Sequence, residues 1–462
     1  MSPLELTRFL LDRIRGLNPS INAYITVSEE LAIQAAKQAE RELCIRGQAK
    51  SRQDRGPLHG IPISLKDNIY TKGIRTTAGS KVLEHFVPRR DAPLVTALQR
   101  AGAVILGKTN MHEFAYGATT ENPHFGTTRN PWDTQRIAGG SSGGSAAALA
   151  AGLCYGSIGT DTGGSIRIPA SCCGVVGLKP GTGRVTAEDV VALAPTLDVV
   201  GPLARGVQDA ALLLQVITAT PPRWRAPGGH DALAARLSTS QRRKVCLGIP
   251  KEFFLEVLDP EVRAAFEAAL RLLRNHGARL KNVSLPLSAE TENARNNIAW
   301  VEATQYHQHS GWFPQRAADY SDEVYKRLEL GAKVTALEYL QAQTVRENFK
   351  QQLIEAFAAN GLHALVVPTT PIPAPLIGQA TVAIQGHDYP TRALLLRLNH
   401  PANLAGVPAI TVPCGLTKTG LPIGLQFISL WSKEASLLQV AHGFEQQYRL
   451  PAYPQLQSPD EN

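Results

Sequence analysis

The sequence contains few of the features that mark secreted, metal-binding or redox proteins. Its 462 residues include only 6 cysteines and 2 methionines. Six cysteines in a chain of this length are too sparse for a disulfide scaffold, and no Cys-x-x-Cys or His-Glu-x-x-His pattern offers zinc ligands. We therefore expect no metal site, and we expect the cysteines to act as small buried side chains in a reducing compartment.

Long hydrophobic runs are also missing. Apolar stretches such as residues 145–153 are well short of the roughly 20 residues that a helix needs to cross a bilayer. The N-terminal residues carry Glu5, Asp12 and Arg13, whereas a signal peptide has an uninterrupted apolar core. These absences predict a cytoplasmic protein that makes no contact with a membrane.

Charge of one sign is scarce as well. The net charge is +8 and only 19% of the residues are charged, so the excess favours an acidic partner only weakly. The one dense basic cluster, Gln241-Arg242-Arg243-Lys244, has no interleaved aromatic residues that could stack on bases. We expect it to be solvated, and we do not expect a nucleic acid partner.

Helical and strand patterns alternate along the chain, which is typical of an α/β protein. Helical spacing over residues 4–17 and 29–45 is followed by short apolar runs at 60–65 and 103–107, and strand patterns return at 364–368 and 409–413. Between them, residues 221–244 are rich in Pro, Gly and Arg and predict a surface linker, and residues 245–360 predict a largely helical insertion. Because strand patterns flank this insertion, we expect a single domain over residues 1–462, with one sheet built from both halves.

Two glycine- and serine-rich blocks are the most unusual part of the composition. The first, Gly139 to Ser145, precedes an Ala-rich helix but lacks the lysine of a phosphate-binding P-loop. In the second, Thr162-Gly163-Gly164-Ser165 could present consecutive backbone N–H groups around a serine oxygen, as an oxyanion hole does. Each block alone is equally compatible with an ordinary tight turn.

A lysine upstream changes the interpretation of these blocks. Lys66 ends the apolar run Ile61-Pro62-Ile63-Ser64-Leu65, where burial of its ammonium group would be costly. Burial lowers the pKa of a lysine, and a neutral lysine is a competent general base. The alternative is a surface lysine that pairs with Asp67.

Taken together, the lysine and the two blocks resemble the amidase signature family, whose members hydrolyse amides through a Ser–Ser–Lys relay. The resemblance extends over nearly the whole chain, through segments at 108–114, 120–123, 129–133, 177–180, 197–202, 403–406 and 421–424. It implies a large mixed, twisted β-sheet that is covered by helices on both faces. It also implies Ser165 as the nucleophile, Ser141 as a bridging serine on a cis peptide bond and Lys66 as the base, with no cofactor.

The resemblance assigns substrate contacts to two further segments. The N–H groups around Thr162, Gly163 and Gly164 would hold the oxyanion. Residues from Ala115 to Asn122 would line the entrance of the site.

The resemblance leaves two interpretations of the substrate. In the first, the chain is a stand-alone amidase that releases ammonia from a small-molecule carboxamide, similar to general bacterial amidases and to carboxybiuret hydrolases. In the second, it is the glutaminase component of glutamyl-tRNA(Gln) amidotransferase. Arg327 matches the segment that supplies a carboxylate-binding arginine in that component, but Leu396 stands where it has an aspartate for the amino group of glutamine, with Arg392 and Arg397 nearby. A homo-oligomer or a small accessory subunit is compatible with either interpretation.

Overall fold

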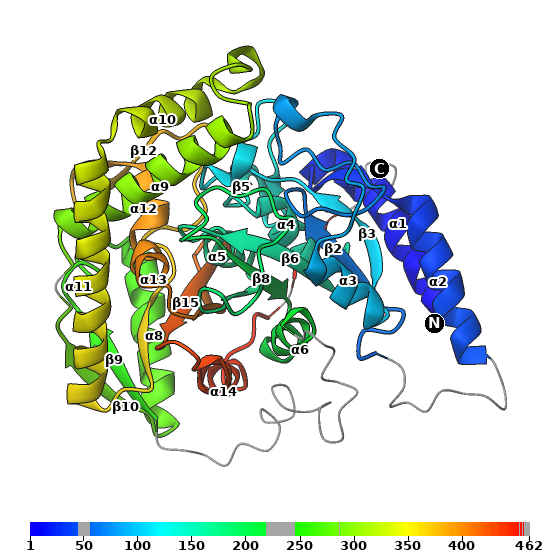
Figure 1. The fold of residues 1–462 in the computed structure, drawn as a ribbon. Coiled ribbons are helices and arrows are strands. Elements are labelled where there is room, and N and C mark those ends of the chain that lie inside the picture. Colours follow the sequence, from blue (N-terminus) through cyan, green and yellow to red (C-terminus); the bar gives the residue numbers. More distant parts are fainter. Residues whose placement is uncertain (45–55, 219–244, 286, 452, 455, 457–462) are drawn as a thin grey trace.

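A mixed sheet of 11 strands forms the centre of the molecule, with strand order β1-β3-β2-β6-β8-β7-β14-β15-β11-β9-β10 (Figure 1). This is seen in a computed structural model that describes residues 1–44, 56–218, 245–285, 287–451, 453–454 and 456. The strands are β1 (Tyr24–Val27), β2 (Pro62–Lys66), β3 (Val104–Thr109), β6 (Gly156–Asp161), β7 (Val176–Lys179), β8 (Val199–Ala204), β9 (Cys246–Pro250), β10 (Arg279–Val283), β11 (Ala364–Pro368), β14 (Ala409–Leu416) and β15 (Pro422–Ile428).

Helices cover both faces of this sheet, as the sequence predicts. The larger ones are α1 (Pro3–Ile21), α2 (Glu29–Cys44), α3 (Pro93–Arg100), α4 (Gly143–Ala150), α5 (Arg167–Cys173), α6 (Val207–Ile217), α8 (Pro260–Asn275), α9 (Ala289–His309), α10 (Asp322–Lys333), α11 (Ala336–Asn360), α12 (Thr391–Arg397), α13 (His400–Ala405) and α14 (Glu434–Glu445). Strand β3 shows the two faces directly, because successive side chains of a strand point to opposite sides. Val104 and Leu106 pack with α1, α2 and α4, whereas Ile105 packs with α3 and α6.

Local sequence signals account for the first helix. Ser2 caps α1 by accepting from the N–H of Glu5, the Glu5 side chain accepts from the N–H of Ser2 in return, and Pro3 occupies the first turn. Such a capping box satisfies two N–H groups that a helix end otherwise leaves unpaired. The predicted helix at residues 4–17 is thus confirmed and extends to Ile21.

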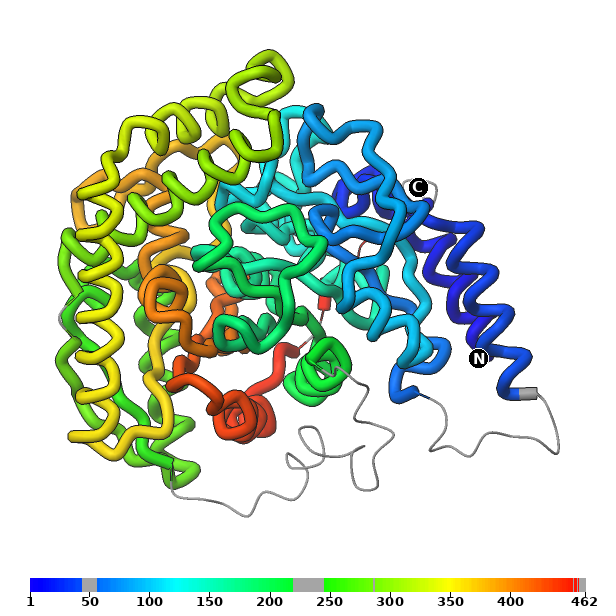
Figure 2. The backbone as a smooth tube through the Cα atoms, viewed as in Figure 1, coloured from blue at the N-terminus to red at the C-terminus, as the bar shows by residue number. Residues whose placement is uncertain are grey.

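The region 245–360 contributes to the sheet as well as covering it. Strands β9 and β10 lie parallel at the far edge of the sheet, opposite α1 and α2, and α9 to α11 form a helical group at that end (Figure 2). The pattern of the sequence does not predict β10, and it marks 132–136 as a poor strand, whereas β5 (Asp133–Ile137) pairs with β4 (Arg129–Asn130) in a separate small sheet.

Some sequence expectations fall on residues without a described structure. The proposed linker at 221–244 and the basic cluster Gln241-Arg242-Arg243-Lys244 lie outside the described residues. Within the described ranges, no helix is both long and apolar enough to cross a membrane.

Candidate active site

The candidate site lies where neighbouring parallel strands end. Strands β3, β2 and β6 run parallel, so their carboxyl ends meet at one edge of the sheet. Lys66 is the last residue of β2 and Asp161 is the last residue of β6. The loops that leave such an edge are where α/β proteins usually hold ligands.

Lys66 is fully buried at this edge and binds two hydroxyl groups. Its Nζ lies 2.7 Å from Ser141 Oγ and 2.7 Å from Thr160 Oγ1. Burial lowers the pKa of Lys66 to about 7, against the opposing pull of Asp161 and Asp198. The amine can therefore exist in its neutral form near neutral pH and accept a proton from the serine.

Ser141 lies at the start of α4, on a backbone that is tied to the surrounding loops. The peptide bond between Gly140 and Ser141 is cis, as the resemblance implies. The N–H of His112 donates to the carbonyl oxygen of Ser141 at 3.2 Å, and the N–H of Ser142 donates to that of Ser165 at 3.1 Å. The structure thus brings together the two glycine- and serine-rich blocks and Lys66.

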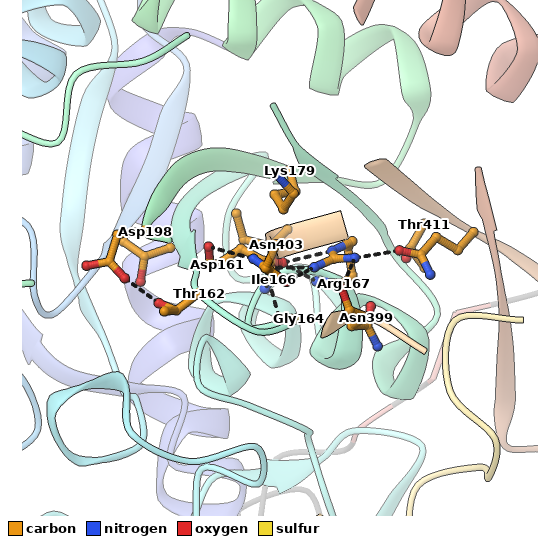
Figure 3. A network of polar contacts seen from close by, with 12 residues as sticks. Asp161, Thr162, Gly164, Ile166, Arg167, Lys179, Asp198, Asn399, Asn403 and Thr411 are labelled. Atoms are coloured by element: carbon orange, nitrogen blue, oxygen red, sulfur yellow. Dashed lines mark hydrogen bonds and ion pairs between the residues drawn. The ribbon is translucent and has the colours of Figure 1, made fainter. Parts of the chain in front are cut away.

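Asp161 organises the loop that carries Ser165. Its carboxylate accepts from the N–H of Gly164 at 2.8 Å and from that of Ile166 at 3.1 Å, and it binds Arg167 at 2.9 Å (Figure 3). Burial alone would raise the pKa of Asp161, but Arg167 and the groups around it hold the pKa below its ordinary value. The expectation that Asp161 and Arg167 pair to hold this loop is confirmed.

This network refines the expected oxyanion hole. The N–H of Gly164 is engaged by Asp161 and is not available to a ligand, which is a correction to its expected role. Among the described residues, the N–H groups of Thr162, Gly163 and Ser165 have no hydrogen-bond acceptor. The Thr162 hydroxyl donates to Asp198 at 2.5 Å, and burial raises the pKa of Asp198 to about 6.

Ala115 lies close to Ser141 through the backbone of His112. It is buried, with a left-handed φ of 59°, and its N–H donates to the carbonyl oxygen of His112 at 2.9 Å. The same His112 donates its own N–H to Ser141, so the start of the 115–122 segment lies near the two serines.

Buried cations beside the Ser165 loop form a feature that local sequence patterns do not reveal. Arg295, on α9, is 5% exposed, and its Nη2 lies 3.4 Å from the carbonyl oxygen of Thr162. Space for a side chain at Gly163 is absent because a Cβ there would stand 2.4 Å from Arg295 Nη2 and 3.1 Å from His400 Nε2. The sequence alone draws attention only to the neighbouring Arg392, since the other residues come from distant segments.

Similarity to known proteins identifies the family of this chain. The Amidase family profile matches residues 5–438. A protein of Geobacter metallireducens that is named as a component of glutamyl-tRNA(Gln) amidotransferase is 40% identical over 480 residues, which cover 96% of this chain and 94% of that protein.

Solved structures agree with this assignment. A crystal structure of an amidase is 35% identical, with a TM-score of 0.87 and coverage of 97% of this chain and 96% of that one. An s-triazine catabolic enzyme, described with a vestigial protein complex, is 33% identical, with a TM-score of 0.87 and coverage of 96% and 95%. The expected fold, a large mixed sheet between helices, is confirmed. The chain belongs to the amidase family and is an amide-hydrolysing enzyme.

Proposed function

We propose that the chain hydrolyses a carboxamide through an acyl-enzyme on Ser165 and releases ammonia. The observation that carries the proposal is the fully buried Lys66, whose Nζ lies 2.7 Å from Ser141 Oγ. A serine hydroxyl is a weak nucleophile unless a base removes its proton during attack. Neutral Lys66 takes a proton from Ser141, and Ser141 takes one from Ser165 as Ser165 Oγ attacks the amide carbon.

The N–H groups of Gly163 and Ser165, with that of Thr162, then stabilise the oxyanion. Preorganised donors of this kind are worth about 3 kcal/mol each in the transition state. Ser141 returns the proton to the leaving nitrogen, so that ammonia departs and the ester to Ser165 remains. Water hydrolyses the ester by the reverse relay, and the carboxylic acid leaves.

Two amide donors are candidates. The curated relatives favour glutamine, and the chain would then supply ammonia to a partner protein within an amidotransferase. The s-triazine enzyme and the amidase structure favour a small carboxamide and a stand-alone hydrolase. Leu396 is buried in an apolar cluster with Ala118 and Ile168, so this position offers no charge to the ammonium group of glutamine.

The test is ammonia release by the purified chain, with Ser165→Ala as the control. The amides are glutamine, glutaramate, which is glutamine without its amino group, and pentanamide. Turnover of glutaramate above glutamine supports the stand-alone hydrolase, and turnover of glutamine alone supports the amidotransferase component. Ser165→Ala should have no turnover, and near-normal activity of this variant would refute the mechanism.

A further inference from the structure

Three buried arginines gather beside the candidate nucleophile loop, and two of them lack a carboxylate partner. Arg327 is satisfied, because it donates to Glu323 and to the carbonyl oxygen of Tyr116. Arg295 reaches only the side chain of Asn296 and the carbonyl oxygen of Thr162, at 3.3 and 3.4 Å. Arg392 has no hydrogen bond or ion pair within the described part of the chain.

Unpaired donors accompany these charges. The Nε atoms of Arg295 and Arg392, His400 Nε2 and the Tyr116 hydroxyl are all buried without a partner among the described residues. Buried polar groups in folded proteins are nearly always hydrogen-bonded, and unpaired buried guanidinium groups are especially costly. A group of such donors around one position indicates a site for a ligand that supplies acceptors.

The location links this group to the chemistry. Arg295 Nη2 and His400 Nε2 lie against Gly163, two residues before Ser165. Consecutive Cα atoms are 3.8 Å apart, so Gly163 and Ser165 are separated by at most about 8 Å. A ligand group bound there can belong to the same small molecule whose amide faces Ser165 if its acyl chain has about three to five carbons.

The surrounding charges leave a net positive pocket. Glu323 balances Arg327, and Asp161 and Asp198 are already bound by Arg167 and Thr162. Burial, together with Arg327 and Arg295, lowers the pKa of Arg392 to about 9, and burial lowers the pKa of Arg295 to about 10. Burial and the nearby arginines hold the pKa of His400 well below its ordinary value, so His400 is a neutral donor.

We propose that Arg295 and Arg392, with His400, form a carboxylate-binding pocket that selects amides whose acyl group ends in a carboxylate. The planar guanidinium group matches a carboxylate with two parallel hydrogen bonds. Arg327 orients Tyr116 and stays bound to Glu323. This proposal rests on the proposed hydrolysis at Ser165 and names the class of its substrate.

The test compares each acidic amide with a neutral amide of the same shape. Succinamate is paired with 4-methylpentanamide, and glutaramate with 5-methylhexanamide, in which an isopropyl group replaces the carboxylate. For the wild-type chain we expect kcat/KM to favour the acidic member by about 100-fold or more, because a neutral group leaves the buried donors unpaired. In Arg392→Met this ratio should fall at least tenfold, mainly through KM, and Arg392→Lys should recover part of it.

Arg397→Met is the matched control, since it removes one arginine from the same helix. Arg397 lies over the ring of Phe253, at 4.0 Å, and pairs with Glu256, so its loss should leave the ratio unchanged. A wild-type preference for the neutral amides, or an equal ratio in wild type and Arg392→Met, would overturn the pocket.

Binding to Ser165→Ala, measured by calorimetry with succinamate and glutaramate, separates the pocket from the hydrolysis. Binding that Arg392→Met abolishes supports the pocket even if the wild-type chain turns over no amide, in which case only the proposed hydrolysis fails. Hydrolysis of neutral amides without binding of either acid refutes the pocket and leaves the hydrolysis standing.

Discussion

The N–H of Ser142 donates to the carbonyl oxygen of Ser165 at 3.1 Å. This one bond joins the two glycine- and serine-rich blocks, and Lys66 Nζ binds the hydroxyl of the adjacent Ser141. The relative position of the two serines is therefore set by backbone hydrogen bonding and does not depend on flexible side chains. Catalytic groups need such placement, because small displacements from the productive geometry cost large factors in rate.

The pKa of Lys66 predicts the acid limb of the pH profile. Only the neutral amine is a base, so activity is present above a pKa of about 7 and lost as the pH falls through it. We expect kcat/KM for ammonia release to rise about tenfold per pH unit below pH 7 and to level off above it. Lys66→Met should lose several orders of magnitude in rate together with this limb. A flat wild-type profile between pH 5 and 8 would contradict the assignment.

Asp198 should shift the same limb. Its negative charge raises the pKa of Lys66, so Asp198→Asn should move the limb to lower pH by roughly half a unit, as one nearby charge changes a pKa by modest amounts. Asp189→Asn is a suitable control, because Asp189 pairs with the exposed Arg90. A shift toward higher pH in Asp198→Asn would show that the carboxylate acts only through Thr162.

Loss of Arg167 should destabilise the fold strongly. Arg167 and Asp161 are both fully buried, and Arg167→Met would leave the Asp161 carboxylate without its main counter-charge. Breaking a buried pair in this way costs about 3–5 kcal/mol. Lys350→Met, which removes a partly exposed pair on α11, should cost less than about 1 kcal/mol. Denaturant unfolding measures both, and equal midpoints for the two variants would contradict the prediction.

Two helical glycines should respond to alanine with opposite signs. At Gly331 on α10, a Cβ would stand 2.1 Å from the carbonyl oxygen of Trp300 on α9, so Gly331→Ala should cost about 1–3 kcal/mol. At Gly443 on α14 nothing lies within 4 Å of the added atom, and Gly443→Ala should stabilise by about 0.4–1 kcal/mol. Thermal unfolding of both variants checks the pair, and a stabilised Gly331→Ala would mean that α9 and α10 separate easily.

The sequence predicts the sheet strands that are buried on both faces and the relay residues at their ends, because both depend on local patterns. Strand β10 escapes prediction because four of its residues are exposed or half-exposed at the edge of the sheet, where apolar patterning is weak. Arg295 escapes for another reason. Its neighbours on α9 look like an ordinary polar helix, and its importance arises only from contact with Gly163, far away in the chain.

The order of the strands bears on when the enzyme becomes active during its synthesis. Lys66, Ser141 and Ser165 all leave the ribosome early, but β14 and β15 occupy the middle of the sheet, between β7 and β11. Asn403, which donates to Asp161 at 2.8 Å, also comes late. A nascent chain that has not yet exposed residues 403–428 therefore carries all three relay residues without the framework that aligns them, so it cannot hydrolyse amides prematurely.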